Sequence, residues 1–162
     1  MQKFIATLFF LSFGVFANDK LHLELINGSW ECPETTQEEE VTIKVNTRYS
    51  YNVSNLTYSY DSKAEMLYQD KLPVGTVQII EKGAFSYQSS KMVYELQSIE
   101  SVVLDDPLEA ITADLIKEME ADLKSDKTEY ETTLINELEW ETLNPNDNSK
   151  VMCHRVMNSL NR

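Results

Sequence analysis

The amino-acid sequence predicts a mainly β domain, an antiparallel up-and-down β-barrel of about eight strands with one amphipathic helix. Short runs of alternating apolar and polar residues fill most of the chain, and a single stretch changes to helical periodicity. Two segments near the ends, Gly28–Cys32 and Cys153–Arg155, also fit one antiparallel register. Closure into a barrel hides strand edges more completely than a β-sandwich does, and the sandwich stays the alternative.

The first residues have the pattern of a secretory signal peptide. Lys3 precedes a mostly apolar run over residues 4–16. Cleavage after Ala17 would leave small residues at the last and third-last positions before the cut, which are the positions that signal peptidase recognises. The run is shorter than the roughly 20 apolar residues that span a bilayer. We therefore expect a signal peptide over residues 1–17, a single domain over residues 18–162, and a periplasmic or secreted location.

The two cysteines and two of their neighbours fit a single strand pairing. In an exported chain, Cys32 and Cys153 have one intramolecular connectivity, a disulfide. If they lie opposite each other on antiparallel strands, Trp30 lies opposite Arg155, because the two pairs of position numbers have the same sum. Residues two apart on a strand share a face, so all four side chains should lie together and fasten the first strand to the last.

The other strands follow the alternation in chain order. Residues 41–53 alternate up to a break at Ser54–Asn55, residues 58–60 resume the pattern, and residues 92–103 continue it. A turn at Lys82–Gly83, between residues 77–79 and 85–87, predicts a hairpin. Later strands are expected over residues 130–138, 140–143 and 150–157, with a turn at residues 144–148.

One segment has helical periodicity. Asp106 is placed to cap a helix that begins at Pro107, a residue type favoured in the first turn. Apolar residues then recur at spacings of three or four, which predicts an amphipathic helix of about five turns. Its apolar face is expected to cover the core or close the barrel. The apolar positions are Leu108, Ile111, Leu115, Met119 and Leu123.

These features resemble the lipocalin or calycin superfamily, and most closely its small exported bacterial lipocalin-like proteins. The resemblance is carried by the Gly28-Ser29-Trp30 triplet at the start of the first strand, by the arginine on the last strand, and by the antiparallel strands with one helix. In that family the tryptophan closes one end of the barrel and the arginine packs across it. The resemblance therefore implies that Gly28, Trp30 and Arg155 close this barrel.

Charge excludes some classes of partner. The chain has 27 Asp and Glu residues against 14 Lys and Arg residues, with a formal net charge of −13. Such a charge repels nucleic acid and anionic membranes, so neither is an expected partner. It favours solubility and leaves a basic protein as a partner to consider.

Catalytic and cofactor-binding motifs are not found in the sequence. It contains no Gly-X-Ser-X-Gly or His-Glu-X-X-His motif and no glycine-rich phosphate loop. The two histidines, His22 and His154, lie near opposite ends of the chain and do not complete a zinc site with the cysteines. We expect no catalytic residue, metal or cofactor. Sequons for N-glycosylation begin at Asn27, Asn52 and Asn55 and matter only in a source that glycosylates.

An eight-stranded barrel either holds one small ligand or is filled by its own side chains. The eight tyrosines therefore either line a pocket or lie on the outer surface. We expect an exported protein that binds a small apolar or amphipathic ligand inside the barrel. The alternative is a non-catalytic acidic interaction module with a filled barrel. The candidate pocket residues are Tyr49, Tyr51, Tyr58, Tyr60, Tyr87 and Tyr94.

Overall fold

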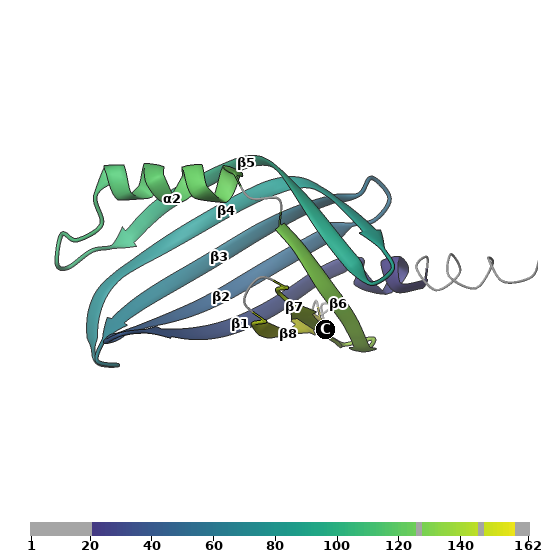
Figure 1. Ribbon diagram of the computed structural model, residues 1–162, viewed down its shortest axis with the longest axis horizontal. Helices are drawn as coiled ribbons and strands as arrows, with labels where there is room; N and C mark the ends of the chain where they lie inside the picture. The colour runs from purple at the N-terminus through teal and green to yellow at the C-terminus, as the bar shows by residue number, and fades with distance from the viewer. Residues whose placement is uncertain (1–20, 126–127, 146–147, 158–162) are drawn as a thin grey trace, which may run out of the picture.

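The computed structural model describes residues 21–125, 128–145 and 148–157. Eight antiparallel strands pair in the order of the chain, and β8 pairs with β1 to close the barrel (Figure 1). The predicted up-and-down barrel is confirmed, and the sandwich alternative is wrong because one sheet closes on itself. The strands are β1 (Gly28–Glu38), β2 (Val41–Asn52), β3 (Thr57–Tyr68), β4 (Leu72–Gln88), β5 (Lys91–Asp105), β6 (Thr128–Asn136), β7 (Glu139–Leu143) and β8 (Lys150–Arg155).

The wall of the barrel is uneven. β4 has 17 residues, whereas β7 and β8 have five and six. β5 pairs with β6 only over Lys91–Tyr94, and β1 pairs with β8 only at Trp30 and Glu31. The strands therefore surround the interior completely at one end, which we call the closed end. At the other end, the wide end, β2 to β5 extend beyond the short strands (Figure 1).

The helix α2 (Ala113–Ser125) connects β5 to β6 and lies along β5 (Figure 1). Its apolar residues have two different environments. Met119 and Leu123 are partly buried, whereas Leu115 is half exposed. Just before the helix, Ile111 packs so closely on Gly75 that a Cβ atom there would lie 2.5 Å from the Ile111 side chain. The helix therefore covers part of the inner face at the wide end, as expected, without burying its whole apolar stripe.

The helix begins at Ala113, and the predicted start at Pro107 is wrong. The Asp106 carboxylate does not cap a helix at Pro107. It accepts hydrogen bonds from the backbone nitrogens of residues 110 and 111, at 2.8 and 2.9 Å, and so stabilises a separate turn. Glu109 interrupts the helical path, because its φ is 52°. Thr112 is the actual cap, and its hydroxyl accepts a hydrogen bond from the third residue after it, at 3.2 Å.

Gly83 does not form a hairpin turn, which corrects a second prediction. β4 runs through this position, and its register with β5 shifts there, as in a β-bulge. A Cβ atom at Gly83 would lie 2.2 Å from the carbonyl oxygen of Glu95 and 2.8 Å from the ring of Tyr58. The glycine therefore permits a close approach between strands. The turn comes later, at Ser89–Ser90, where φ values of 53° and 64° suit a two-residue hairpin loop.

The core is concentrated at the closed end. A short helical segment over residues 21–26, which the sequence analysis did not predict, lies beside this end (Figure 1). Ile26 at its end is fully buried and belongs to the core cluster. The other large members of this cluster are Trp30, Tyr51, Tyr58, Phe85, Met92, Tyr94 and Trp140.

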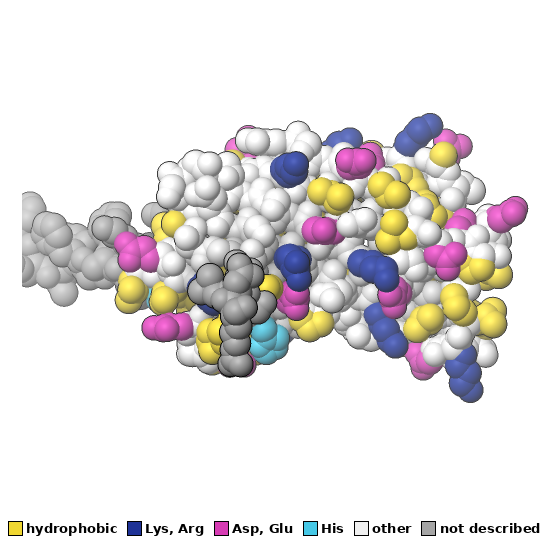
Figure 2. All heavy atoms as spheres, turned by 180° about the vertical axis from the view of Figure 1, so that it is seen from behind, with side chains coloured by type: hydrophobic (Ala, Val, Ile, Leu, Met, Phe, Trp, Pro, Cys, Tyr) yellow, Lys and Arg dark blue, Asp and Glu magenta, His cyan; other side chains and the backbone are white. Residues whose placement is uncertain are grey.

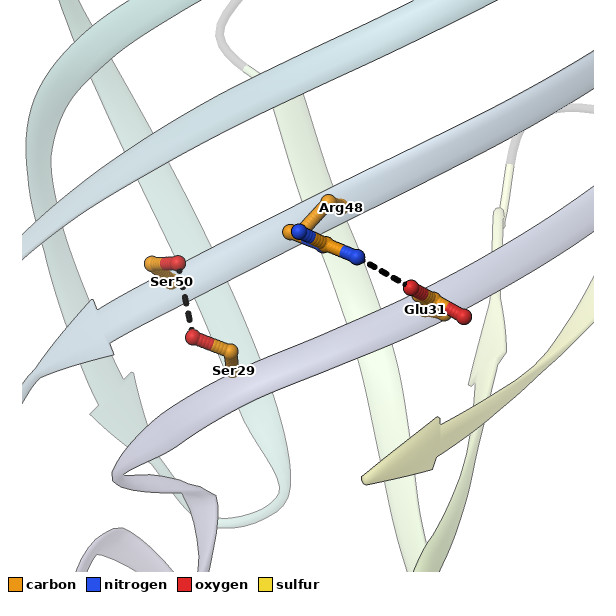
Figure 3. A network of polar contacts seen from close by, with 4 residues as sticks. All are labelled: Ser29, Glu31, Arg48 and Ser50. Carbon is orange, nitrogen blue, oxygen red and sulfur yellow. Dashed lines mark hydrogen bonds and ion pairs between the residues drawn. The ribbon is translucent and has the colours of Figure 1, made fainter. Parts of the chain in front are cut away.

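The outer face of β1 and β2 is polar. Arg48 Nη2 lies 2.5 Å from Glu31 Oε1, and the hydroxyls of Ser29 and Ser50 are 2.9 Å apart (Figure 3). Figure 2 shows acidic, basic and hydrophobic side chains interspersed on the rear face. Charges of opposite sign alternate on this face, which gives little support to docking of a basic partner there.

Candidate ligand cavity

The first and last strands are joined in the register that the sequence predicts. Trp30 pairs with Arg155, and Cys32 forms a disulfide with Cys153, with 4.2 Å between their Cα atoms. The Arg155 guanidinium carbon lies 4.4 Å from the centre of the Trp30 ring, within the range of a cation–π contact. Both the disulfide and the tryptophan–arginine pairing are therefore confirmed. A disulfide is compatible with a location outside the cytoplasm.

Arg155 also ties together the loops around the closed end. Its guanidinium donates hydrogen bonds to the carbonyl oxygens of Leu25, Asn27 and Glu137, the last two at 2.9 and 2.8 Å. Gly28 has a φ of 114°, and a Cβ atom there would lie 3.1 Å from Arg155 Nη1. This glycine therefore provides both the backbone conformation and the space that the arginine needs.

The ring of Trp30 is fully buried, and its nitrogen donates a hydrogen bond to the Ile26 carbonyl at 2.7 Å. A second tryptophan, Trp140, completes this layer, and the sequence analysis missed it. Trp140 is fully buried, lies 5.6 Å from Trp30, and stands edge-to-face with Tyr51 at 5.7 Å. Trp140 pairs with Cys153 across β7 and β8, and this pairing was the signal that could have found it.

Two adjoining cavities lie inside the barrel, next to the tryptophan layer. Their volumes are about 210 and 120 Å³. The larger also borders the disulfide, and the smaller is bordered by Leu96 of β5 and Leu123 of α2. The two cavities share four lining tyrosines, so we treat them as one site, the tyrosine cavity. The shared residues are Tyr49, Tyr60, Tyr94 and Tyr130.

Five of the six tyrosines that the sequence analysis chose line this space. Tyr51 borders the larger cavity and Tyr58 the smaller, in addition to the shared Tyr49, Tyr60 and Tyr94. Tyr87 borders neither of the two cavities. Tyr87 lies near the end of β4 and packs against the N-terminal helical segment, where its hydroxyl is 3.0 Å from His22 Nδ1. Among the lining tyrosines, the one that the sequence analysis did not choose is Tyr130 of β6.

The tyrosine rings pack against one another, some nearly parallel and others at steep angles. Tyr49 meets Tyr60 at 5.1 Å and 68°, and Tyr58 meets Tyr94 at 4.9 Å and 77°. The hydroxyls of Tyr51 and Tyr94 are hydrogen-bonded at 2.6 Å. Aromatic rings in edge-to-face contact stabilise one another beyond the area that they bury. The cavity is therefore bounded by mutually packed rings.

Burial raises the pKa values of these phenols, which are neutral at pH 7. Loss of solvation raises the pKa of Tyr58 to about 12, and the nearby Glu81 carboxylate adds to the rise. Loss of solvation also raises the pKa values of Tyr49, Tyr51 and Tyr94 well above the usual 10. Each phenol can therefore act as a neutral donor or acceptor of hydrogen bonds toward the cavity.

An acidic side chain also lines the smaller cavity, and the sequence analysis missed it. Glu81 lies on the inner face of β4, opposite Tyr60 of β3 and Ile99 of β5. Burial raises the pKa of the Glu81 carboxyl. Within the described part of the chain, this carboxylate has no hydrogen bond or ion pair. Its place in the alternation of Val77 and Ile79 was the signal that could have revealed it.

A larger hollow of about 470 Å³ lies over the outer face of β1 to β5, where Ser29, Ser50 and Ser59 leave space beside Lys82 and Gln97. The tyrosine cavity is the better candidate site, because it lies inside the fold and combines aromatic rings with polar side chains.

No protein-family model matches this sequence, and comparison with curated proteins finds no significant relative. In the described ranges, no three or more His, Cys, Asp or Glu side chains are grouped to hold a metal ion. No described helix is long and apolar enough to cross a membrane. The predicted signal peptide, residues 1–17, lies outside the described residues. The sequon residues Asn27, Asn52 and Asn55 are all exposed.

Proposed function

We propose that this protein is an exported, lipocalin-like and non-catalytic binding protein that holds a small apolar or amphipathic ligand inside its barrel. The observation that carries the proposal is the tyrosine cavity, whose two parts measure about 210 and 120 Å³. The alternative, an acidic interaction module, would have a filled barrel. This volume suits a small molecule, on the order of ten to fifteen non-hydrogen atoms.

Two further observations support the proposal. The wall of the smaller part is aromatic and aliphatic apart from its phenolic hydroxyls and Glu81, a composition usual for a small-molecule site. The larger part adds threonine, serine, asparagine and glutamate side chains to the tyrosines, which suits the polar end of an amphipathic ligand. The signal-like residues 1–17 and the disulfide between Cys32 and Cys153 both favour export.

The test is binding of 1-aminoanthracene, a small apolar dye whose fluorescence rises in a nonpolar site. We expect saturable binding by the folded, disulfide-intact protein. Val45→Phe should weaken binding about tenfold or more, because Val45 borders the larger cavity and the added ring fills it. Ile43→Phe is the matched control, since Ile43 lies two residues away on the same face of β2 and borders neither cavity.

Absence of dye binding by the wild-type protein would contradict the proposal and favour the interaction module. Equal binding by wild type and both variants would place the dye outside the tyrosine cavity, and would also contradict it.

A further inference from the structure

The charged groups that line the tyrosine cavity all have one sign. Glu81 borders its smaller part, and Glu34 borders its larger part from an exposed position. No described Lys, Arg or His borders either part. Acid–base pairs instead occur on the outside, for example between Lys63 and Glu65. The cavity therefore has a negative charge that none of the described side chains lining it neutralises.

Glu81 occupies a position where an apolar residue would pack more simply. The preceding inner positions of β4 are Val77 and Ile79, and the groups opposite Glu81 are Tyr60 and Ile99. A carboxylate that loses water without gaining a partner is unfavourable, so packing alone does not account for it. A cationic group on a ligand would supply the missing counter-charge.

The surrounding rings favour the same ligand charge. The face of a tyrosine ring attracts a cation that lies within about 6 Å of the ring centre. Tyr49 and Tyr60, like Tyr58 and Tyr94, meet at steep angles, so the cavity presents several ring walls in different orientations. An anionic ligand would instead be repelled by the Glu81 carboxylate and by these ring faces.

We propose that the tyrosine cavity selects a small organic cation, an amine with a short apolar body. Its ammonium group would lie at Glu81 among the tyrosine rings, and its apolar part would contact Leu96 and Leu123, which border the same space. This inference rests on the proposed function, that the cavity holds a small molecule, and adds the charge of that molecule.

The test compares three probes of similar size and different charge: phenethylamine, 2-phenylethanol and phenylacetate. Each is titrated against 1-aminoanthracene bound to the full folded chain at neutral pH. We expect phenethylamine to displace the dye at a concentration at least about tenfold lower than 2-phenylethanol does. Phenylacetate should be the weakest of the three.

Glu81→Gln then locates the source of the preference, since it keeps the shape of the side chain and removes its charge. We expect it to weaken phenethylamine about tenfold or more and to change 2-phenylethanol less than about twofold. Glu95→Gln is the matched control, because Glu95 is exposed on the neighbouring strand and its loss changes the net charge by the same amount. This control should bind all three probes as the wild type does.

The outcomes separate the two proposals. If the dye binds in the cavity but the amine is not preferred, or if Glu81→Gln and Glu95→Gln have equal effects, the cation proposal is wrong and the binding function stands. If the dye itself does not bind, the proposed function fails and the cation proposal fails with it.

Discussion

The closed end and the tyrosine cavity are neighbouring layers of one barrel, and they differ in whether their polar groups have hydrogen-bond partners. At the closed end, Arg155 donates hydrogen bonds to three carbonyl oxygens and Trp30 donates one to Ile26. The indole nitrogen of Trp140 is the exception, since it is buried without a partner among the described residues. In the cavity, Glu81 has no such partner and the rings border empty volume. The closed end favours stability, whereas the cavity keeps space and charge that stability does not require.

Trp30→Ala should have the largest effect on stability. The ring is fully buried and packs against Trp140, so its removal leaves a large hole in the closed end. We expect the free energy of unfolding to fall by about 3–5 kcal/mol, measured by urea denaturation. Leu96→Ala, a change in the wall of the cavity, should cost less because Leu96 is only partly buried. Equal losses would show that the two layers do not differ.

Removal of the disulfide should have the next largest effect. Cys32 and Cys153 are separated by 121 positions, so their bond restricts a long loop in the unfolded chain. The double variant Cys32→Ala and Cys153→Ala should lose about 2–5 kcal/mol of unfolding free energy. Peptide mapping without reduction should find the two cysteines joined in the wild type. Recovery of free thiols from the exported protein would contradict this part of the account.

Arg155→Ala should cost about 1–3 kcal/mol, because the ring contact and the hydrogen bonds to backbone carbonyls are lost together. Combined with Trp30→Ala, its effect should be non-additive by roughly 0.5–2 kcal/mol in a double-mutant cycle. Arg48→Ala is the matched control, since it removes an exposed ion pair with Glu31 and should cost less than about 1 kcal/mol. A cycle without coupling would separate the tryptophan from the arginine energetically.

The free energy of unfolding should fall in alkali because of the buried phenols of the cavity. Its buried phenols hold their protons more tightly in the folded than in the unfolded chain, with the pKa of Tyr58 at about 12. Their contribution to the free energy of unfolding is therefore complete below pH 10. It is lost as the pH rises from 10 through the pKa values of the folded state, at about 1.4 kcal/mol per pH unit for each group. Ultraviolet titration should show these phenols ionising together with unfolding. Ionisation of all eight tyrosines near pH 10 in the folded state would contradict this.

Glu81→Gln should have the smallest effect on stability and the opposite sign. Burial raises the folded pKa of this carboxyl, so its ionised form destabilises the folded state at neutral pH. The variant should melt a few degrees higher than the wild type at pH 7, measured by calorimetry. The difference should shrink as the pH falls through the folded pKa and vanish below the ordinary value near 4.5. A lower melting temperature would mean that Glu81 has a stabilising partner.

The closed end could be predicted from the sequence because the position of a residue along a strand determines the face on which its side chain lies and the residue opposite it. The two-residue spacing and one antiparallel register were sufficient to join Cys32 to Cys153 and Trp30 to Arg155. The glycines were less informative about the fold, because glycine is favoured both in turns and where two strands approach closely. Gly83 proved to be a close approach, which depends on a carbonyl from β5 that the local sequence does not reveal.

The cavity could be predicted only in part. Alternation selected most of its tyrosines, but Tyr87 has the same periodicity and packs against the core near the end of β4, away from the cavity. The depth of a residue along the barrel depends on strand length and on the register shift at Gly83, which alternation does not show. Glu81 was visible in the same pattern, yet a single acid within a strand is usually assigned to the solvent face.

Native mass spectrometry of the protein purified from its own compartment tests the central claim, that the tyrosine cavity is a ligand site, most directly. We predict that the folded wild-type chain carries the added mass of a small organic molecule, which is released on denaturation. Val45→Phe, with the larger cavity filled, should lack that mass, and Ile43→Phe should retain it. A wild-type chain with its disulfide intact, no added mass and no uptake of 1-aminoanthracene would contradict the account.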